Sequence, residues 1–262
     1  MNLSPLLEDQ HLDEPGMIEP SRIFADSDAP AVAVMCFFQE AIDAVGTRPG
    51  VTVHGKLSDF RGRPVHEVNR NGRRVALFFP GVGAPSAVSA MEEAIAMGCR
   101  DFIAVGGAGS LVHGHELGDV LVVDSAVRDE GTSHHYLPPG QVVDADPYLT
   151  EVLHQTATEA GLKPRLGRTW TTDAIFRETP SRVRRRVDQG CLMVEMEAAA
   201  FFAVGQFRGV RVGQLLYSGD TLAGEAWDRR DWTSAVDVRT ALLDLALDAA
   251  ARTEPASTAK RR

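Results

Sequence analysis

The stretch VEMEAAAF, Val194 to Phe201, joins two predicted elements of different type. Residues 191–197 are strand-like, and the run of alanines falls within a helix predicted over 197–209. In extended backbone, residues two apart share a face, so Glu195 and Glu197 are expected to project into one space. A carboxylate can accept hydrogen bonds from two adjacent ribose hydroxyls. The alternative is a helix start at which acidic side chains complement the helix dipole.

Apolar segments on both sides of this stretch alternate between strand and helix patterns. Several strands are apolar throughout, as expected when helices cover both faces. Asn71–Gly72 predicts a hairpin turn within 55–79 and therefore some antiparallel pairing. The strands are predicted over 31–38, 73–79, 101–105, 119–127, 165–172 and 210–217, and the helices over 86–98, 147–161, 197–209 and 234–251. The pattern predicts a three-layer α/β/α sandwich with a central mixed sheet.

The ends of the chain differ from its middle in composition. A length of 262 residues suits one α/β domain, predicted over 29–251. Residues 1–28 are acidic and contain proline, which predicts a mobile or loosely docked N-terminal arm. Residues 252–262 combine charges, Pro and Ser without an apolar period, and a disordered tail is expected there.

Charge and composition restrict the partners. The net charge of −9 argues against nucleic acid, whose phosphates attract basic surfaces. The start of the chain lacks the features of a signal peptide, and no apolar run approaches the ~20 residues of a membrane helix. The three cysteines have no CxxC spacing, as expected in a reducing compartment. A cytoplasmic protein with a small-molecule ligand and no membrane contact is expected.

Four segments that follow predicted strands carry glycines or carboxylates. They span 78–86, 105–110, 171–179 and 217–225. Ligands of open α/β sheets bind beyond the carboxyl ends of strands, so these segments are expected to enclose one pocket. Asp220 in the last of them could protonate a leaving purine at N7, or it could simply cap a turn.

Other ligand classes are disfavoured by spacing. The glycines at 81 and 83 lack the third glycine of a dinucleotide-binding fingerprint. The glycine segment 105–110 would need a crossover helix after it, and residues 110–118 are too short to form one. His113–His115 and His134–His135 have no third ligand at a recognisable spacing, so no metal is expected. The four arginines of 181–188 are interpreted as a solvated helix face.

Taken together, these segments resemble the nucleoside phosphorylase superfamily, which includes uridine phosphorylases, hexameric purine nucleoside phosphorylases and methylthioadenosine/adenosylhomocysteine nucleosidases. The similarity runs from about residue 74 to 250. It is carried by GVGAPSAVSAMEEAIAMG, FIAVGGAGSL, LGDVLVVDSAVRDEGTSHHY, TTDAIF, VEMEAAAFFAV and YSGD, in that order. The VEMEAAAFFAV motif is the most specific of them.

The resemblance implies a role for each matching residue. Glu197 would grip the ribose and stabilise an oxocarbenium-like transition state, with Glu195 and Met196 beside the sugar. Asp220 would protonate the purine. Phe176 or Ile175 would stack on the base, with Asp173 and Asp220 as further base contacts, and Gly83 and Gly107 would line the phosphate pocket. Arg128 and Arg177 could supply the positive charge that binds phosphate.

The implied activity is phosphorolysis of a purine-type nucleoside, with inorganic phosphate as co-substrate, no cofactor, and assembly as a homodimer or homohexamer. The phosphate-binding arginine of the family's N-terminal loop is missing from the corresponding residues 24–38. Hydrolysis by water, activated by Glu195 or a neighbour, therefore stays open. So does a non-catalytic nucleoside-binding protein on the same fold.

Overall fold

The computed structural model describes residues 11–24, 27–57 and 62–254. Parts of the expected arm, 1–10 and 25–26, lie outside the described residues, as does the expected tail from 255 onward. The described strands are β1 Val32–Cys36, β2 Thr52–Lys56, β3 Pro64–Arg70, β4 Arg73–Phe78, β5 Asp101–Ser110, β6 Val120–Asp129, β7 Val142–Asp144, β8 Arg165–Thr172, β9 Cys191–Glu195 and β10 Arg211–Thr221. The α-helices are α1 Gln39–Gly46, α2 Ala84–Met97, α3 Pro147–Glu159, α4 Pro180–Asp188, α5 Ala198–Arg208 and α6 Val236–Arg252.

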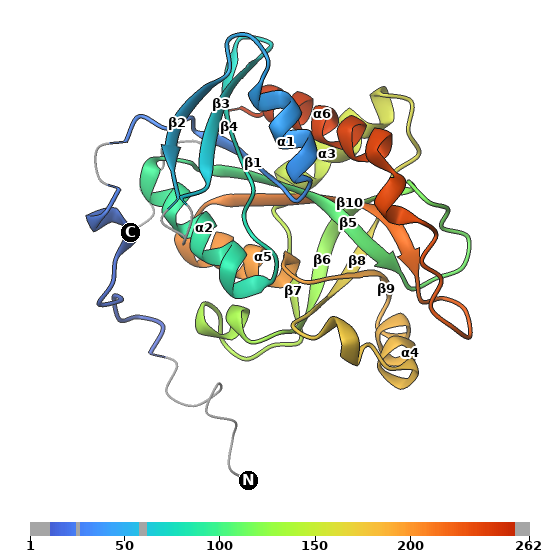
Figure 1. Cartoon of the computed structure of the whole chain (residues 1–262). Coiled ribbons are helices and arrows are strands. Elements are labelled where there is room, and N and C mark those ends of the chain that lie inside the picture. Colours follow the sequence, from blue (N-terminus) through green and yellow to red (C-terminus); the bar gives the residue numbers. More distant parts are fainter. Residues whose placement is uncertain (1–10, 25–26, 58–61, 255–262) are drawn as a thin grey trace.

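These strands form one mixed sheet, which confirms the predicted fold class. Strand β1 lies between β4 and β5 and is parallel to both, while β3 and β4 form the antiparallel hairpin predicted from Asn71–Gly72. Helices α2 and α5 pack on one face, and α1, α3 and α6 pack on the other (Figure 1). Both faces are therefore covered, as the apolar strands required.

Part of the sheet closes on itself. Strand β5 pairs with β10, β10 with β6, β6 with β8, and β8 with β9. Strand β9 then returns to β5 through the pairs Gly109–Val194 and Ser110–Met193. The ends of β5, β9 and β10 are thus held together, although they are far apart in sequence.

The segment 105–110 was expected to be a loop beyond a strand, and this expectation is wrong. It is the second half of β5, and Asp220 likewise lies inside the longer β10. The glycines are needed because aromatic rings pack on the strand: a Cβ at Gly106 would lie 3.1 Å from Phe37 Cδ2, and one at Gly107 would lie 3.0 Å from Tyr217 Cε1. The strand therefore continues where its composition predicted a turn.

Helix α4 is tied to the closed part of the sheet, a small barrel, by a partly buried cluster. The Asp129 carboxylate on β6 accepts hydrogen bonds from Trp170 Nε1 and from the guanidinium groups of Arg182 and Arg186, at 2.6–2.9 Å. Both arginines also stack on the Trp170 ring. The interpretation of 181–188 as a solvated face is therefore wrong for Arg186, whose side chain is 12% exposed, whereas Arg182 is paired but stays 37% exposed. The cluster fixes the segment 173–188 beside the ends of β8 and β9.

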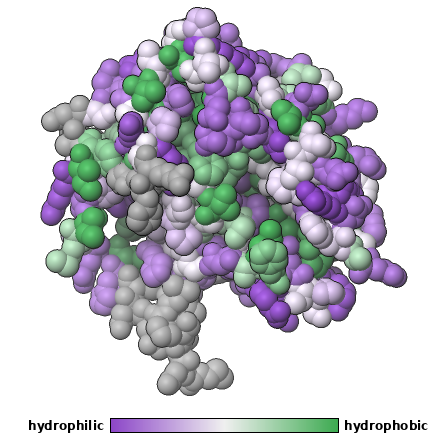
Figure 2. All heavy atoms as spheres, in the orientation of Figure 1, coloured by the Kyte–Doolittle hydropathy of each residue, from purple (hydrophilic) through white to green (hydrophobic). Residues whose placement is uncertain are grey.

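The surface is predominantly polar. Figure 2 shows hydrophilic side chains over most of one face, with separate apolar groups among them. None of the helices in the described ranges is long and apolar enough to cross a membrane. Among the same residues, no group of three or more His, Cys, Asp or Glu could hold a metal ion.

Candidate active site

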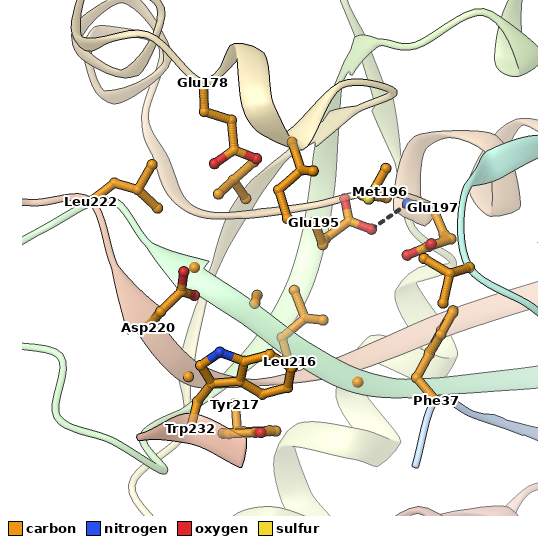
Figure 3. Close-up of a pocket in the computed structure, with 18 of the residues that line it drawn as sticks. Phe37, Glu178, Glu195, Met196, Glu197, Leu216, Tyr217, Asp220, Leu222 and Trp232 are labelled. Carbon is orange, nitrogen blue, oxygen red and sulfur yellow. Dashed lines mark hydrogen bonds between the residues drawn. The ribbon is translucent and has the colours of Figure 1, made fainter. Parts of the chain in front are cut away.

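A cavity of about 670 Å³ opens where β5, β9 and β10 end (Figure 3). Its walls come from the β1–α1 junction, the end of β5, the segment around residue 176, the β9–α5 junction and the region after β10. The lining residues are Phe37, Phe38, Glu40, Val82, Gly106 to Gly109, Ile175, Phe176, Glu178, Val194 to Glu197, Gln214, Leu216, Tyr217, Gly219, Asp220, Leu222, Trp227, Arg229, Trp232 and Arg239. All four segments that the sequence singled out contribute to this space, and the β1–α1 and β9–α5 junctions add to them.

Glu195 builds the junction between β9 and α5. Its Oε2 accepts hydrogen bonds from the backbone N–H groups of Glu197 and Ala198, both at 2.7 Å (Figure 3 draws one). Its Oε1 accepts from Thr171 Oγ1 at 2.6 Å, and that hydroxyl oxygen accepts from Ala199 N. Glu195 therefore fits the alternative interpretation of this motif, in which an acidic side chain lies at the start of a helix and complements its dipole. These contacts occupy both carboxylate oxygens, which disfavours a role as ribose ligand or base.

Glu197 is held at the cavity wall by a second loop. Its side chain is buried, and Oε1 accepts a hydrogen bond from Gly83 N–H at 2.5 Å. Gly83 has φ +87°, a left-handed conformation that favours glycine. Burial first, and then the nearby Glu195 carboxylate, raise the pKa of Glu197 above its ordinary value. A ligand that brings hydroxyl donors or positive charge would stabilise the ionised form.

Asp220 and Glu178 occupy the opposite side of the cavity from Glu197 (Figure 3). The Asp220 Oδ2 accepts a hydrogen bond from Trp227 Nε1 at 2.6 Å. Burial, and then the Asp220 charge, raise the pKa of Glu178 to about 7. The Glu178 and Asp220 carboxyl groups therefore face one space.

The predicted stacking residues lie at the mouth of the cavity. Ile175 is 52% exposed and Phe176 is 95% exposed, and both line the opening. Met196 lines the cavity between the two acids of its motif. Gly107 also lines it, beneath the Tyr217 ring. These positions are compatible with the contacts that the sequence led us to expect.

Four predicted site residues do not line the cavity. The Arg128 guanidinium donates to Ser133 Oγ and to loop carbonyls including that of Pro138, so its position gives no support to phosphate binding. Asp173 accepts from Gly131 N–H instead of facing the cavity. Arg177, in the short 3-10 helix Ile175–Arg177, and Gly83 also lie outside the lining.

The structure adds residues that the sequence did not single out. Among the described lining residues, the cations are Arg229 and Arg239. Arg239 Nε lies 2.6 Å from Glu40 Oε1, so its charge is paired within the cavity wall. Glu178 and Trp227 complete the side that holds Asp220. Glu178 belongs to the predicted segment 171–179, whereas Trp227, Arg229 and Arg239 lie outside the four predicted segments, and only the fold brings them to the cavity.

The chain has sequence relatives among known proteins. The chain is 32% identical over 161 residues to the uridine phosphorylase of Thermococcus kodakarensis, covering 56% of this chain and 58% of that one. It is 32% identical over 157 residues to the guanosine phosphorylase of Halorubrum lacusprofundi, covering 59% and 64%. The matched region thus spans less than two thirds of these two relatives. A DeoD-type purine nucleoside phosphorylase of Bacillus cereus is 28% identical over 182 residues, covering 68% and 76%.

The fold has close counterparts among solved structures. The purine nucleoside phosphorylase of Toxoplasma gondii, solved with immucillin-H, superimposes with a TM-score of 0.75 at 22% identity, covering 91% of this chain and 97% of that one. A uridine phosphorylase of Vibrio fischeri gives 0.69 at 24% identity, covering 86% and 90%. The family model described as "Phosphorylase superfamily" matches residues 31–252, and the chain therefore belongs to the phosphorylase superfamily.

Proposed function

We propose that this protein cleaves the N-glycosidic bond of a purine-type nucleoside by phosphorolysis, releasing the base and ribose 1-phosphate. The observation that carries the proposal is that Glu197 and Asp220 face one cavity from opposite sides (Figure 3). A nucleoside lying between them would place its sugar at Glu197 and its base at Asp220. The relatives named as phosphorylases support the choice of phosphate as acceptor.

The sugar would bind at the β9–α5 junction. Glu197 would accept hydrogen bonds from the ribose 2′- and 3′-hydroxyls, and Met196 would pack against the ring. As the glycosidic bond lengthens, positive charge develops on the sugar. A carboxylate already fixed by Gly83 N–H stabilises this charge without rearranging during the reaction.

The base would lie between the mouth and the end of β10. Ile175 and Phe176 would cover one face of the purine. Asp220 would donate a proton to N7 as the bond from C1′ to N9 breaks, so that the base leaves as a neutral molecule. Phosphate oxygen would then form the new bond to C1′. The proposal invokes no cofactor and no metal.

Hydrolysis is a second candidate because of one observation. The positive charges among the described lining residues are those of Arg229 and Arg239, and Arg239 is paired with Glu40. At Arg239, phosphate would have to compete with the Glu40 carboxylate. Water, being neutral, would not. Glu195 is a poor candidate for its base, because its carboxylate is bound to the β9–α5 backbone.

A nucleoside panel tests the proposal directly. Purine and pyrimidine nucleosides are incubated with and without inorganic phosphate, and the base and sugar products are separated. We expect purine release that requires phosphate and yields ribose 1-phosphate. Free ribose at the same rate without phosphate would identify a hydrolase. No base release from any nucleoside would favour a non-catalytic nucleoside-binding protein.

We also infer a cytoplasmic homo-oligomer, a dimer or a hexamer, whose domain extends over residues 29–251. The three cysteines are buried and free, which supports a reducing compartment. Phe176 at the cavity mouth is almost fully exposed, which favours a second copy that covers it. Light scattering measures the mass in solution, and a monomer at micromolar concentration would contradict the oligomer.

A further inference from the structure

The Asp220 carboxyl has a defined orientation. Its Oδ2 accepts a hydrogen bond of 2.6 Å from Trp227 Nε1. An indole N–H donates but cannot accept, and the carbonyl oxygen of a neutral carboxyl group is a much stronger acceptor than its hydroxyl oxygen, so this bond favours Oδ2 as the carbonyl oxygen. When Asp220 is a neutral acid, the arrangement therefore places the acidic proton on the other oxygen, Oδ1.

The surroundings of Oδ1 place it beside the cavity wall. A Cβ added to Gly109 would lie 3.2 Å from Asp220 Oδ1 and 2.8 Å from Leu222 Cδ1. Gly109 belongs to the stretch of β5 that lines the cavity. The absence of a side chain at this position leaves room for the carboxyl, and for the proton that it would donate.

The backbone holds Trp227 in place for this contact. The chain turns back after β10, and an isolated antiparallel bridge joins Thr221 to Asp228 through two hydrogen bonds of 2.9 and 3.0 Å. Trp227 precedes the bridged residue and so lies next to the end of β10. Its side chain is 62% exposed, whereas Trp170 in the barrel is completely buried. Packing therefore does less to hold the side chain of Trp227 in place than that of Trp170. The hydrogen bond to Asp220 is the polar contact of the Trp227 indole.

We propose that Trp227 is a positioning residue for the acid, which fixes the proton of Asp220 on Oδ1 and stabilises the carboxylate that remains. This inference rests on the proposed function. In the step, the C1′–N9 electron pair goes to the purine, and the proton moves from Asp220 Oδ1 to N7. Phosphate oxygen supplies the new bond to C1′. Asp220 is left ionised, and the Trp227 N–H donates to the new anion, a stronger hydrogen bond than one to a neutral acid.

The experiment uses a leaving group that needs no proton. A 7-methylpurine nucleoside already carries positive charge on its base, so its departure does not depend on the acid. Trp227→Phe removes the N–H and keeps an aromatic ring. We expect kcat with the unmethylated purine nucleoside to fall about tenfold, the effect of losing one hydrogen bond to a charged group. With the 7-methyl substrate, kcat should change less than about twofold, since no proton is transferred to N7.

A double-mutant cycle with Asp220→Asn completes the test. If the indole acts through the acid, Trp227→Phe has little further effect in the Asp220→Asn background. Equal losses on both substrates, no loss on either, or losses that multiply in the double variant would overturn the inference. If the unaltered protein releases base from neither nucleoside, the proposed function itself is wrong and the inference falls with it. Melting temperatures of the variants separate these effects from unfolding.

Discussion

The two sides of the cavity are built differently. The sugar side is a buried backbone junction with hydrogen bonds shorter than 3 Å. Gly83 N–H donates to the Glu197 carboxylate, and the Glu195 carboxylate accepts from Glu197 N–H and from the Thr171 hydroxyl. The base side is formed by exposed segments, in which Trp227 and Phe176 reach solvent. The difference indicates that recognition of ribose depends on a rigid core element, whereas recognition of the base depends on segments that can vary without disturbing the fold.

Removing the charge of Glu197 should have the largest effect. Glu197→Gln retains the shape of the side chain but loses the negative charge that stabilises the sugar cation. We expect kcat/KM to fall about 1000-fold for every nucleoside that is cleaved, whatever its base. The exposed Glu151→Gln on α3 serves as a control. If kcat/KM fell only for nucleosides with one kind of base, Glu197 would not be a contact of the sugar.

Asp220→Asn should lower the rate less, and selectively. We expect a fall of about 100-fold in kcat with purine nucleosides, because general acid catalysis is lost. KM should change little, since the amide is nearly isosteric with the acid. Steady-state kinetics with substrates of different base measures this selectivity. An equal loss with every base would show that Asp220 does not act on the leaving group.

The rigidity of the sugar side is tested by Thr171→Val. This change removes a buried hydroxyl that donates to Glu195 and accepts from Ala199 N–H. We expect the free energy of unfolding to fall by about 1–3 kcal/mol, the cost of leaving buried groups without partners. Thr172→Val is the matched control, because the neighbouring hydroxyl accepts one longer bond, at 3.2 Å, from Ala174 N–H. Equal destabilisation in chemical denaturation would contradict the role of the Thr171 hydroxyl in fixing the sugar side.

The smallest effect concerns Glu178 on the base side. Its pKa is raised to about 7 by burial and by Asp220, so the unfolded chain loses this proton at lower pH than the folded one does. The stability contributed by the protonated side chain is complete below about pH 4.5 and is lost as the pH rises to 7. At pH 8 the free energy of unfolding of Glu178→Gln should therefore exceed that of the unaltered protein. The difference should be only about 1 kcal/mol because the site is partly solvated. At pH 4 the two proteins should be closer in stability. Thermal melts at both pH values measure this, and the opposite order would contradict the direction of the shift.

Several local features were predictable because they depend on neighbours in the chain. The periodicity predicted β8 over 165–172 and helix α6 close to its observed bounds. Asn71–Gly72 predicted the β3–β4 hairpin, since both residues adopt positive φ readily. The pattern of alternating elements then required a mixed sheet covered by helices on both faces.

Other features could not be obtained in this way. The glycines of 105–110 have the composition of a turn, and only the packing of Phe37 and Tyr217 shows that they belong to a strand. Arg128 was a reasonable anion ligand until the fold enclosed its guanidinium among loop carbonyls. Glu195 and Glu197 share a motif, but only one of them has the hydrogen-bond pattern of a structural acid.

The sequence by itself determined most of the alternation of strands and helices, without α1 and β7, and the acids around which a site could form, because periodicity and motif spacing are properties of the chain. The tertiary structure decided which of those acids face the same space. It also decided that Trp227 meets Asp220 and that Arg239 meets Glu40. The physical reason is that hydrogen bonds and ion pairs act over a few ångströms, whereas these partners reach that range only after the sheet closes and the chain turns back on it.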